Sequence, residues 1–593
     1  MAPPDIPAAK RAGLPVDLDR LAAEGDGWLT PEDRYALKTY GVCAQTQDHQ
    51  FMVRIRIPGG VLPTDQARGL ARIARRHGPD WLHLTTRQNL ELHWVPDRQV
   101  AKVLDEIARL GLSTRSACGH TMRNVMCSED AGLGLDEPFD CFPDARAVSD
   151  ALLARSAELN VTMPSRINIA FGGSPRCRAD ALVNDAGFVS VTRPRPDRQA
   201  SDDRQASDDR PASYCGPATD DRQATDDRQA TDGGVEAGYQ LWAGGSLGKA
   251  PALAIALSDF VARADVLAAA EALVDVFVAH GDLDTPAKGR MKFVVAAMGE
   301  AGFRAAWDQA FAAARDRPHP EPVPVEVLGD ADRVAVLGRL PPGGWSAGVR
   351  PQREAGRALL TVQLPLGDTN GSELELLCDL ADHHAGGVLV LGRDQDVVLR
   401  DVELAAIPAI RERLRERGLY FAGESHVASV RACTGSAVCA LGVTTAPAAG
   451  QDLLASPALG RNSSLRVHIS GCPNSCAQHQ AADIGLAGTK VRLGGRAREG
   501  YQLYLGADLA RGELGEVVGR VAEADVPAAV ETVVGAWEAL RHDGEGLAST
   551  VRRMGLDAFA AHVGAVLDER WATGPEPDEE VAPSVVPGSP TAQ

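Results

Sequence analysis

The chain has 593 residues, of which 44% are hydrophobic, so it can form several domains with cores of their own. Its formal net charge of −19 argues against a nucleic-acid or membrane-surface partner, because both favour a protein with a basic face. Eleven cysteines in a chain of this length do not indicate a disulfide framework. The sequence has neither a secretory signal at its start nor a run of 18 apolar residues. We therefore expect a soluble, cytoplasmic protein whose thiolates are available to bind metal.

Residues 1–30 are expected to form a flexible tail, and residues 31–112 the first folded unit. The apolar pattern of this unit alternates over predicted strands and repeats every three to four residues over predicted helices. The elements are a strand over Phe51–Ile57, a helix over Thr64–His77, strands over Leu82–Thr86 and Asn89–Val95, and a helix capped by Asp97 that ends near Leu110. This βαββα order predicts a ferredoxin-like half-domain.

The same order of elements returns in residues 340–420, so a second ferredoxin-like half-domain is expected there. Short segments also repeat: Gly238–Trp242 matches Gly500–Tyr504, and Ile57–Gly60 matches Leu364–Gly367. Larger α/β domains are predicted over 113–325 and 421–572. The expected fold class is therefore α+β, with two halves related by a pseudo-twofold axis.

One segment departs from the repeat. Near copies of Ser-Asp-Asp-Arg-Gln-Ala recur between Arg193 and Gly234, with almost no large apolar side chain. Such a segment cannot bury a core, so residues 193–234 are expected to be a disordered insertion between two strands. Residues 573–593 are expected to be a second flexible tail.

Four cysteines near the end of the chain carry the strongest chemical signal. Cys433 and Cys439 are separated by five residues, and Cys472 and Cys476 by three. Two close pairs of thiolates are typical of one tetrahedral metal centre, which leaves zinc, an iron–sulfur cluster and disulfides as alternatives. Zinc ribbons usually place two residues within each pair, so this spacing favours an iron–sulfur cluster.

Other motifs, in the same order along the chain, make the sequence resemble the sirohaem and [4Fe–4S] nitrite and sulfite reductases. The cysteine pairs are similar to that family's Cys-x5-Cys and Cys-x3-Cys. Arg54–Gly60 resembles its Arg-x-Arg-x-Pro-Gly-Gly segment, Thr85–Asn89 its Thr-x-Arg-Gln segment, and Arg123–Val125 its Arg-Asn-Val segment. The resemblance runs from about Leu37 to Val563, apart from the insertion.

The resemblance implies that sirohaem lies in a cleft between the halves, with the cluster held by Cys433, Cys439, Cys472 and Cys476. Cys476 is then the ligand shared by the cluster and the sirohaem iron, which couples the two redox centres. Sirohaem carries eight carboxylates, so cationic and polar side chains are needed to bind it. The candidates are Arg56, Arg87, Asn89, His93, Arg290 and Lys292, together with the backbone at Gly244 and Gly245.

The resemblance also implies a substrate face made by Arg54, Arg123, Arg166 and Asn168. Cations there attract an anion and stabilise charge while nitrite becomes ammonia, or sulfite becomes sulfide, with six electrons. The family usually shows Pro-Arg-Lys-Phe-Lys in sulfite reductases and Pro-Arg-Lys-Phe-Asn in nitrite reductases. This chain has Pro164-Ser165-Arg166-Ile167-Asn168, and the neutral Asn168 favours nitrite.

Electrons are expected from a small carrier such as ferredoxin, because no G-x-G-x-x-G βαβ unit is apparent. Two rival functions remain: a precorrin-3B synthase, which is built on the same scaffold, and a non-enzymatic iron–sulfur or zinc-stabilised protein. The other cysteines lack partner spacing and are expected to be structural: Cys43 (where relatives often have tyrosine), Cys118, Cys127, Cys141, Cys215 and Cys378.

Overall fold

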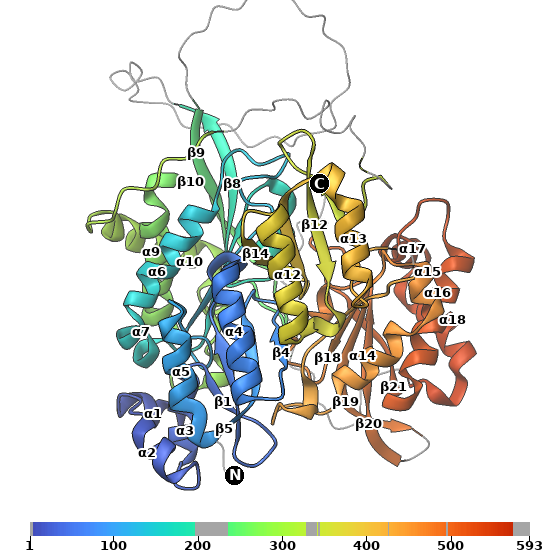
Figure 1. Cartoon of the computed structure of the whole chain (residues 1–593), viewed down its shortest axis with the longest axis horizontal. Helices are drawn as coiled ribbons and strands as arrows, with labels where there is room; N and C mark the ends of the chain where they lie inside the picture. The colour runs from blue at the N-terminus through green and yellow to red at the C-terminus, as the bar shows by residue number, and fades with distance from the viewer. Residues whose placement is uncertain are drawn as a thin grey trace, which may run out of the picture.

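A computed structural model describes residues 4–195, 235–327, 341, 344–424, 426–493 and 496–572. Four β-sheets form the framework, and helices cover their outer faces (Figure 1). The first half of the chain lies beside the second, as the change from blue and green to yellow and red shows. Among the helices of the described residues, none is both long and apolar enough to cross a membrane.

The first ferredoxin-like half-domain has the predicted elements. These are β2 (Gln50–Ile55), α4 (Thr64–His77), β4 (Leu82–Leu84), β5 (Leu90–Pro96) and α5 (Val100–Arg109), with β1 (Val42–Ala44) at the sheet edge. Asp97 does not cap α5. Its carboxylate instead accepts hydrogen bonds from the backbone N–H groups of Arg98 and Asp26, at 2.6 and 2.9 Å.

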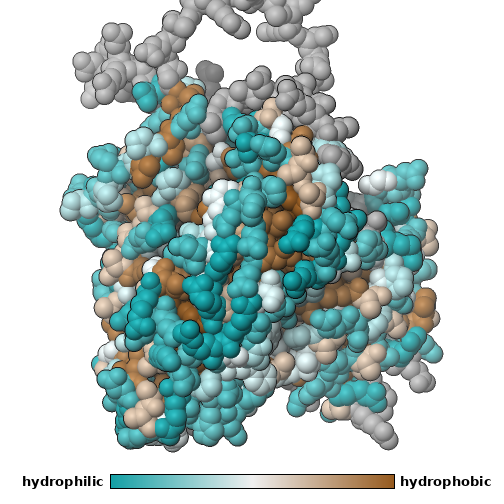
Figure 2. Space-filling model, in the orientation of Figure 1, coloured by the Kyte–Doolittle hydropathy of each residue, from teal (hydrophilic) through white to brown (hydrophobic). Residues whose placement is uncertain are grey.

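The second ferredoxin-like half-domain repeats this arrangement. Its elements are β11 (Val349–Pro351), β12 (Arg357–Gln363), α12 (Gly371–His384), β14 (Val388–Leu391), β15 (Val397–Glu403) and α13 (Ile407–Arg415). In both half-domains the buried side chains of the strands and helices join one hydrophobic core, which spans the two sheets. On the face shown in Figure 2, mostly hydrophilic residues cover the helices and hydrophobic residues appear mainly between them.

Each half-domain completes the sheet of the other. β3 (Val61–Pro63) pairs with β14, and β13 (Asp368–Thr369) pairs with β4. Each of these short strands follows one of the repeated turns, Pro58–Gly60 or Pro365–Gly367, where the backbone adopts positive φ. The exchange explains why the turn motif occurs twice: it leads the chain across the pseudo-twofold axis.

Two buried glutamines at equivalent positions fix this crossing. The Gln88 side-chain amide donates to the carbonyls of Cys127 and Leu391, both at 2.9 Å. The Gln395 amide donates to Leu84 at 2.8 Å and Ala432 at 3.1 Å, and it has 2% of its surface exposed. Each side chain therefore joins both halves.

The two larger domains also match. Each holds three parallel strands followed by two antiparallel ones, in the orders β6-β7-β8-β9-β10 and β17-β18-β19-β20-β21. The first set is β6 (Met122–Cys127), β7 (Ile167–Gly172), β8 (Ala186–Pro194), β9 (Val235–Ala243) and β10 (Ile255–Ala262). The second is β17 (Ser429–Ala432), β18 (Arg466–Ser470), β19 (Ile484–Leu493), β20 (Arg496–Leu505) and β21 (Glu516–Ala522). The repeated Gly-Tyr-Gln-Leu segments lie in β9 and β20.

The expectation of a flexible N-terminal tail is wrong for residues 4–30. They form α1 (Ile6–Arg11) and α2 (Leu18–Glu24), and α3 (Pro31–Thr39) follows. Asp5 and Asp17 cap the first two helices, and Leu21 has 1% of its surface exposed in the core of the half-domains. The expected insertion joins β8 to β9, where Pro194 pairs with Val235; its residues 196–234 and the tail 573–593 lie outside the described residues.

Replacing Gln395 with alanine should destabilise the protein. The substitution leaves two buried carbonyls at the crossing without a donor, which costs about 2–4 kcal/mol of unfolding free energy. Urea titration measures the loss. Gln309→Ala, at an exposed position of α10 (Met291–Arg315), is the control and should stay within about 0.5 kcal/mol of the parent protein. Equal stability of the two variants would show that Gln395 does not fix the crossing.

Candidate active site

The four cysteines come together because β17 and β18 are adjacent and parallel. Cys433 follows the end of β17 and Cys472 follows the end of β18, so both pairs begin at one edge of the sheet. The backbone N–H of Gly471 donates to the Cys433 sulfur at 3.2 Å. Burial, and then the neighbouring Cys476 thiol, raises the pKa of Cys433. A metal centre must therefore displace protons from these thiols as it binds.

The distances between the sulfurs exclude a single zinc ion held as the structure stands. In the described residues, no three of these sulfurs lie within 4.8 Å of one another. Four thiolates on one zinc would be about 3.8 Å apart, because the bonds are about 2.3 Å long. The wider spacing fits a larger group such as a [4Fe–4S] cluster.

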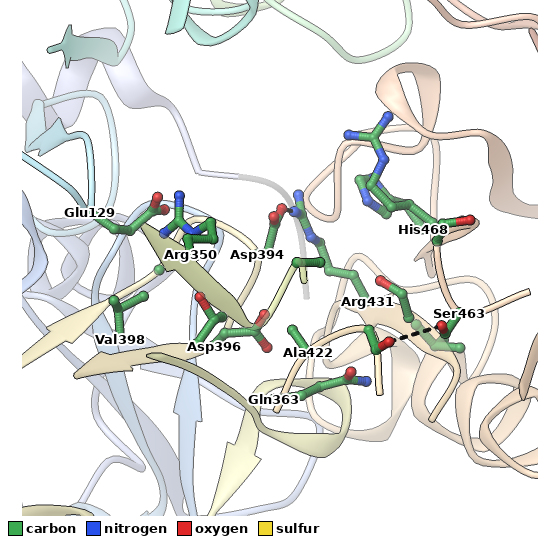
Figure 3. Close-up of a pocket in the computed structure, with 18 residues that line it drawn as sticks. Glu129, Arg350, Gln363, Asp394, Asp396, Val398, Ala422, Arg431, Ser463 and His468 are labelled. Atoms are coloured by element: carbon green, nitrogen blue, oxygen red, sulfur yellow. Dashed lines mark hydrogen bonds and ion pairs between the residues drawn. The ribbon is translucent and has the colours of Figure 1, made fainter. Parts of the chain in front are cut away.

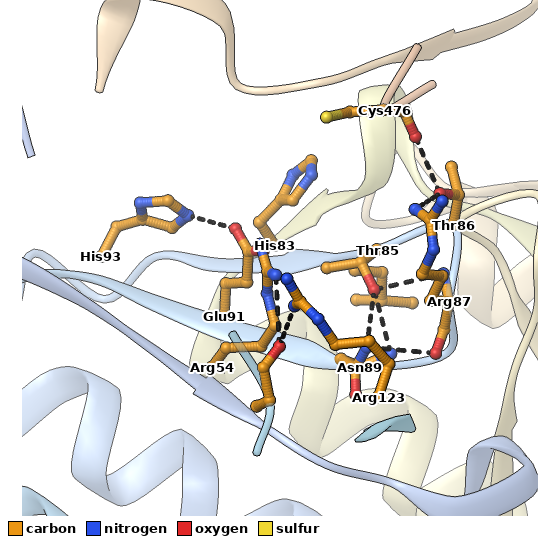
Figure 4. A network of polar contacts seen from close by, with 12 residues as sticks. Arg54, His83, Thr85, Thr86, Arg87, Asn89, Glu91, His93, Arg123 and Cys476 are labelled. Atoms are coloured by element: carbon orange, nitrogen blue, oxygen red, sulfur yellow. Dashed lines mark hydrogen bonds and ion pairs between the residues drawn. The ribbon is translucent and has the colours of Figure 1, made fainter. Parts of the chain in front are cut away.

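Five arginines face the region beside Cys476 and share only two carboxylates. Arg54 pairs with Glu91 at 2.5 Å, and Arg290 pairs with Asp185 at 2.9 Å (Figure 4 shows the first pair). The other three, Arg87, Arg123 and Arg166, form no ion pair with any described residue.

The neighbouring arginines lower one another's pKa values. Repulsion from Arg290, followed by burial and then by Arg123 and Arg87, holds the pKa of Arg166 well below its ordinary value. Burial, together with Arg123 and Arg290, lowers the pKa of Arg87 to about 10 even though the Cys476 thiol opposes the shift. Arg166 has no hydrogen-bonding partner in the described part of the chain. This arginine cluster is thus suited to bind an anionic group, and the carboxylates of sirohaem fit that need.

A chain of contacts joins the cysteine loop to the arginines. The Thr86 hydroxyl donates to the Cys476 carbonyl at 2.8 Å, and Arg87 Nε donates to the Asn168 side chain at 3.2 Å (Figure 4 shows the Thr86 contact). Asn168 in turn donates its backbone and side-chain N–H groups to Asp185, at 2.9 and 3.1 Å. Residues from both halves therefore meet at one place.

Thr86, Asp185 and Glu91 were not predicted, although the sequence held a signal for one of them. Asp185 lies in the segment that matches Ala482–Gly485 of the second half. There Asp483 accepts a hydrogen bond from the backbone N–H of Arg466 at 2.9 Å, just as Asp185 does from Asn168. The repeat thus marks an aspartate that fixes the neighbouring strand.

Three predicted cofactor-binding residues support the arginines from behind. Arg56 has 1% of its surface exposed and donates to the Met122 carbonyl at 2.6 Å. His93 Nε2 contacts Glu91 at 3.1 Å, and its ring stacks on Trp81. Asn89 donates to the Arg87 carbonyl at 3.1 Å and so shapes the turn that carries Arg87. Arg56 Nε and His93 Nδ1 are buried and have no hydrogen-bonding partner among the described residues, so the prediction that these two residues bind the cofactor stays open.

The glycine loop after β9 reaches the cysteine loop of the other half. Gly244 has a φ of +85°, and a Cβ at Gly245 would lie 2.3 Å from the Leu182 carbonyl. Gln480 donates to the Gly248 carbonyl at 2.8 Å. Lys292 donates to the Ala250 carbonyl of the same loop. These residues position the loop beside the second cysteine pair.

A separate cavity of about 370 Å³ is lined mainly by the second half, with Glu129 of the first half at its wall (Figure 3). The repeat places its Thr361 where the first half has Arg54, and its Asp394 where the first half has Arg87. Asp394 pairs with Arg431, the cation nearest to it. The cavity is therefore the counterpart of the arginine cluster, but its charge is largely compensated.

Thr86→Val should weaken the retention of the metal centre. The substitution keeps the side-chain shape but removes the hydrogen bond that ties the cysteine loop to the first half, at a cost of about 1 kcal/mol. Loss of iron from the loaded protein during dialysis should become about fivefold faster. Thr86→Ser, which keeps the hydroxyl, should match the parent. Equal iron loss in all three proteins would contradict the role of this contact.

Asp396 in the second-half cavity should make stability depend on pH. Burial, and then Glu129, raises its pKa from 3.8 to about 8. The folded protein therefore holds a proton that the unfolded chain releases, so stability falls as pH rises from about 4 to about 8. Asp396→Asn should exceed the parent by at least about 1 kcal/mol at pH 8 but not at pH 5, measured by urea titration. The exposed Asp557→Asn variant is the control; an equal gain there would contradict the assignment.

Comparison with known proteins gives the same picture. Residues 44–110 and 350–417 match the nitrite/sulfite reductase ferredoxin-like half domain. Residues 118–313 and 423–571 match the nitrite and sulphite reductase 4Fe-4S domain. The structure of the NirA protein of Mycobacterium tuberculosis superimposes with a TM-score of 0.73 at 23% identity, over 94% of this chain and 98% of that one, which confirms the fold.

Curated relatives cover most of the chain. A ferredoxin–nitrite reductase of Synechococcus elongatus is 29% identical over 81% of this chain and 85% of its own length. A ferredoxin sulfite reductase of Mycolicibacterium paratuberculosis is 28% identical over 85% and 82%. The predicted family, cofactors and general reaction are confirmed, and the synthase and non-enzymatic alternatives are not favoured. The chain belongs to the nitrite and sulfite reductase family and is an oxidoreductase that uses sirohaem and a [4Fe–4S] cluster to reduce nitrite or sulfite.

Proposed function

We propose that the substrate of this enzyme is nitrite, which it reduces to ammonia with electrons from ferredoxin. The argument for an anion rests on the positive charge of Arg87, Arg123 and Arg166, which pair with no carboxylate in the described part of the chain. The neutral side chain of Asn168 is the reason for choosing nitrite over sulfite. Nitrite has one negative charge and sulfite has up to two, so the substrate with less charge needs fewer cations around it.

Asn168 is held as a neutral spacer. Its side chain accepts from Arg87 at 3.2 Å and donates to Asp185 at 3.1 Å, and it has 1% of its surface exposed. The chain therefore supplies a hydrogen-bonded amide where the sulfite reductases of this family tend to carry lysine. This arrangement supports nitrite over sulfite.

The remaining residues have separable roles in this proposal. Arg54 is oriented by Glu91, and Arg123 is oriented by the Gly119 carbonyl at 2.9 Å, so both can bind substrate oxygens without moving. Arg166 lacks any such partner among the described residues, and it contributes charge that draws the anion in. Arginine releases protons poorly, so we assign it a binding role and leave proton delivery to water. Cys433, Cys439, Cys472 and Cys476 would hold the cluster, and the cluster and sirohaem would pass the electrons of the donor to the substrate.

Ferredoxin is proposed as the donor on two grounds. The relatives of Synechococcus elongatus and Spinacia oleracea are both named ferredoxin–nitrite reductases. In this chain, Leu441 lies two residues after Cys439 and has 67% of its surface exposed. An exposed apolar residue beside the cluster ligands suits a surface on which a small electron carrier docks.

The test is steady-state oxidation of reduced viologen by the loaded enzyme with nitrite and sulfite in parallel. The parent should show the higher kcat/KM with nitrite. Asn168→Lys should lower the ratio of nitrite to sulfite kcat/KM at least tenfold, about 1.4 kcal/mol, because the added cation favours the more charged anion. Gln309→Lys adds the same charge at an exposed site and should leave the ratio unchanged. A parent that prefers sulfite would overturn the nitrite proposal.

A further inference from the structure

Two cysteines that the reaction does not use lie side by side near the substrate arginines. Cys43 is in β1, and Cys118 is in the segment that leads into β6. These segments pack without a gap: the Ser116 N–H donates to the Thr39 carbonyl at 2.7 Å. A Cβ at Gly41 would lie only 2.5 Å from the Thr114 carbonyl. The backbone thus brings the two cysteines together.

The two side chains are close enough to interact, since Cys43 and Cys118 each shift the pKa of the other. The pair is also next to two substrate-facing arginines. The carbonyl of Ala117, the residue before Cys118, accepts hydrogen bonds from Arg54 and Arg123. A thiol in such an electropositive place is the kind that reacts as a thiolate.

The electrostatic environment of Cys118 also favours the thiolate form. Interaction with the Cys43 thiol, together with Arg54 and Arg123, lowers the pKa of Cys118 to about 6 although burial opposes the shift. Cys43 is partly exposed, which gives a small reagent a path to the pair. The pair therefore combines a reactive sulfur with a neighbour that can resolve the product.

The chain contains a matched pair without these properties. The sulfurs of Cys127 and Cys141 lie 3.5 Å apart, but both residues have 0% of their surface exposed. Contact with Cys127, together with burial, raises the pKa of Cys141 well above its ordinary value. This second pair touches but is expected to be inert.

We propose that Cys43 and Cys118 are a reversible disulfide-forming pair, oxidised by a small peroxide. The Cys118 thiolate attacks one oxygen of hydrogen peroxide, the O–O bond breaks, and the hydroxide that leaves takes a proton to become water. The Cys43 sulfur then attacks the sulfenic sulfur of Cys118, the S–O bond breaks, and a second water leaves with the Cys43 proton. Two thiols and one peroxide thus give one disulfide and two waters.

Trypsin separates the cysteines cleanly enough to test this. Cleavage after arginine and lysine places Cys43 in the peptide Thr39–Arg54 and Cys118 in Ser116–Arg123, whereas Cys127 and Cys141 share Asn124–Arg146. The loaded enzyme is treated with one equivalent of hydrogen peroxide, its free thiols are blocked with N-ethylmaleimide, and the digest is analysed by mass spectrometry. We expect a cross-linked pair of the first two peptides that dithiothreitol separates, while Asn124–Arg146 stays reduced and blocked.

Two variants separate the steps. In Cys43→Ser, the Cys118 sulfenic acid should persist and be trapped by dimedone, and Cys141→Ser should leave the cross-link unchanged. The proposal is overturned if both peptides of the treated parent carry the maleimide label. It is also overturned if Cys127 and Cys141 oxidise as readily as Cys43 and Cys118, because proximity alone would then explain the bond.

Discussion

An excess of positive charge in one cluster of arginines is the constraint on which the rest of this structure depends. Five guanidinium groups meet there, and among the described residues only Arg54 and Arg290 have a carboxylate partner. Such an arrangement costs free energy unless an anion compensates it, as the lowered pKa values of Arg87 and Arg166 indicate. Two buried carboxylates offset part of this cost. Glu91 fixes Arg54 and Asp185 fixes Arg290, which leaves the other arginines for an anionic ligand.

The duplicated fold explains how the charge is confined to one cluster. Both halves have the same strand orders and exchange short strands, so each has an equivalent position for a binding site. In the second half Thr361 and Asp394 stand where the first has Arg54 and Arg87, and Asp394 pairs with Arg431. The cysteines diverged in the opposite sense. Cys472 of the second half matches Ser174 of the first, so one half contributes the thiolates and the other contributes most of the cations.

Much of the fold could be predicted because periodicity and repeats report backbone geometry directly. The helix Thr64–His77 has the bounds expected from its apolar stripe, and the Gly-Tyr-Gln-Leu repeats lie in matching strands. The helices within residues 4–30 were missed because each is short, and its stability comes from packing of residues such as Leu21 against distant strands. The motifs identified the region of the site but not each role. Arg56 and Arg54 are two residues apart on one strand, yet only the fold shows that Arg56 is buried against Met122 while Arg54 reaches the arginine cluster.

The most direct test of this account is a structure of the loaded enzyme with nitrite bound. We predict one anion among Arg54, Arg123 and Arg166, and none in the second-half cavity, where Asp394 compensates Arg431. An anion in the second-half cavity, with none at the first-half arginines, would contradict the claim that uncompensated charge places the substrate.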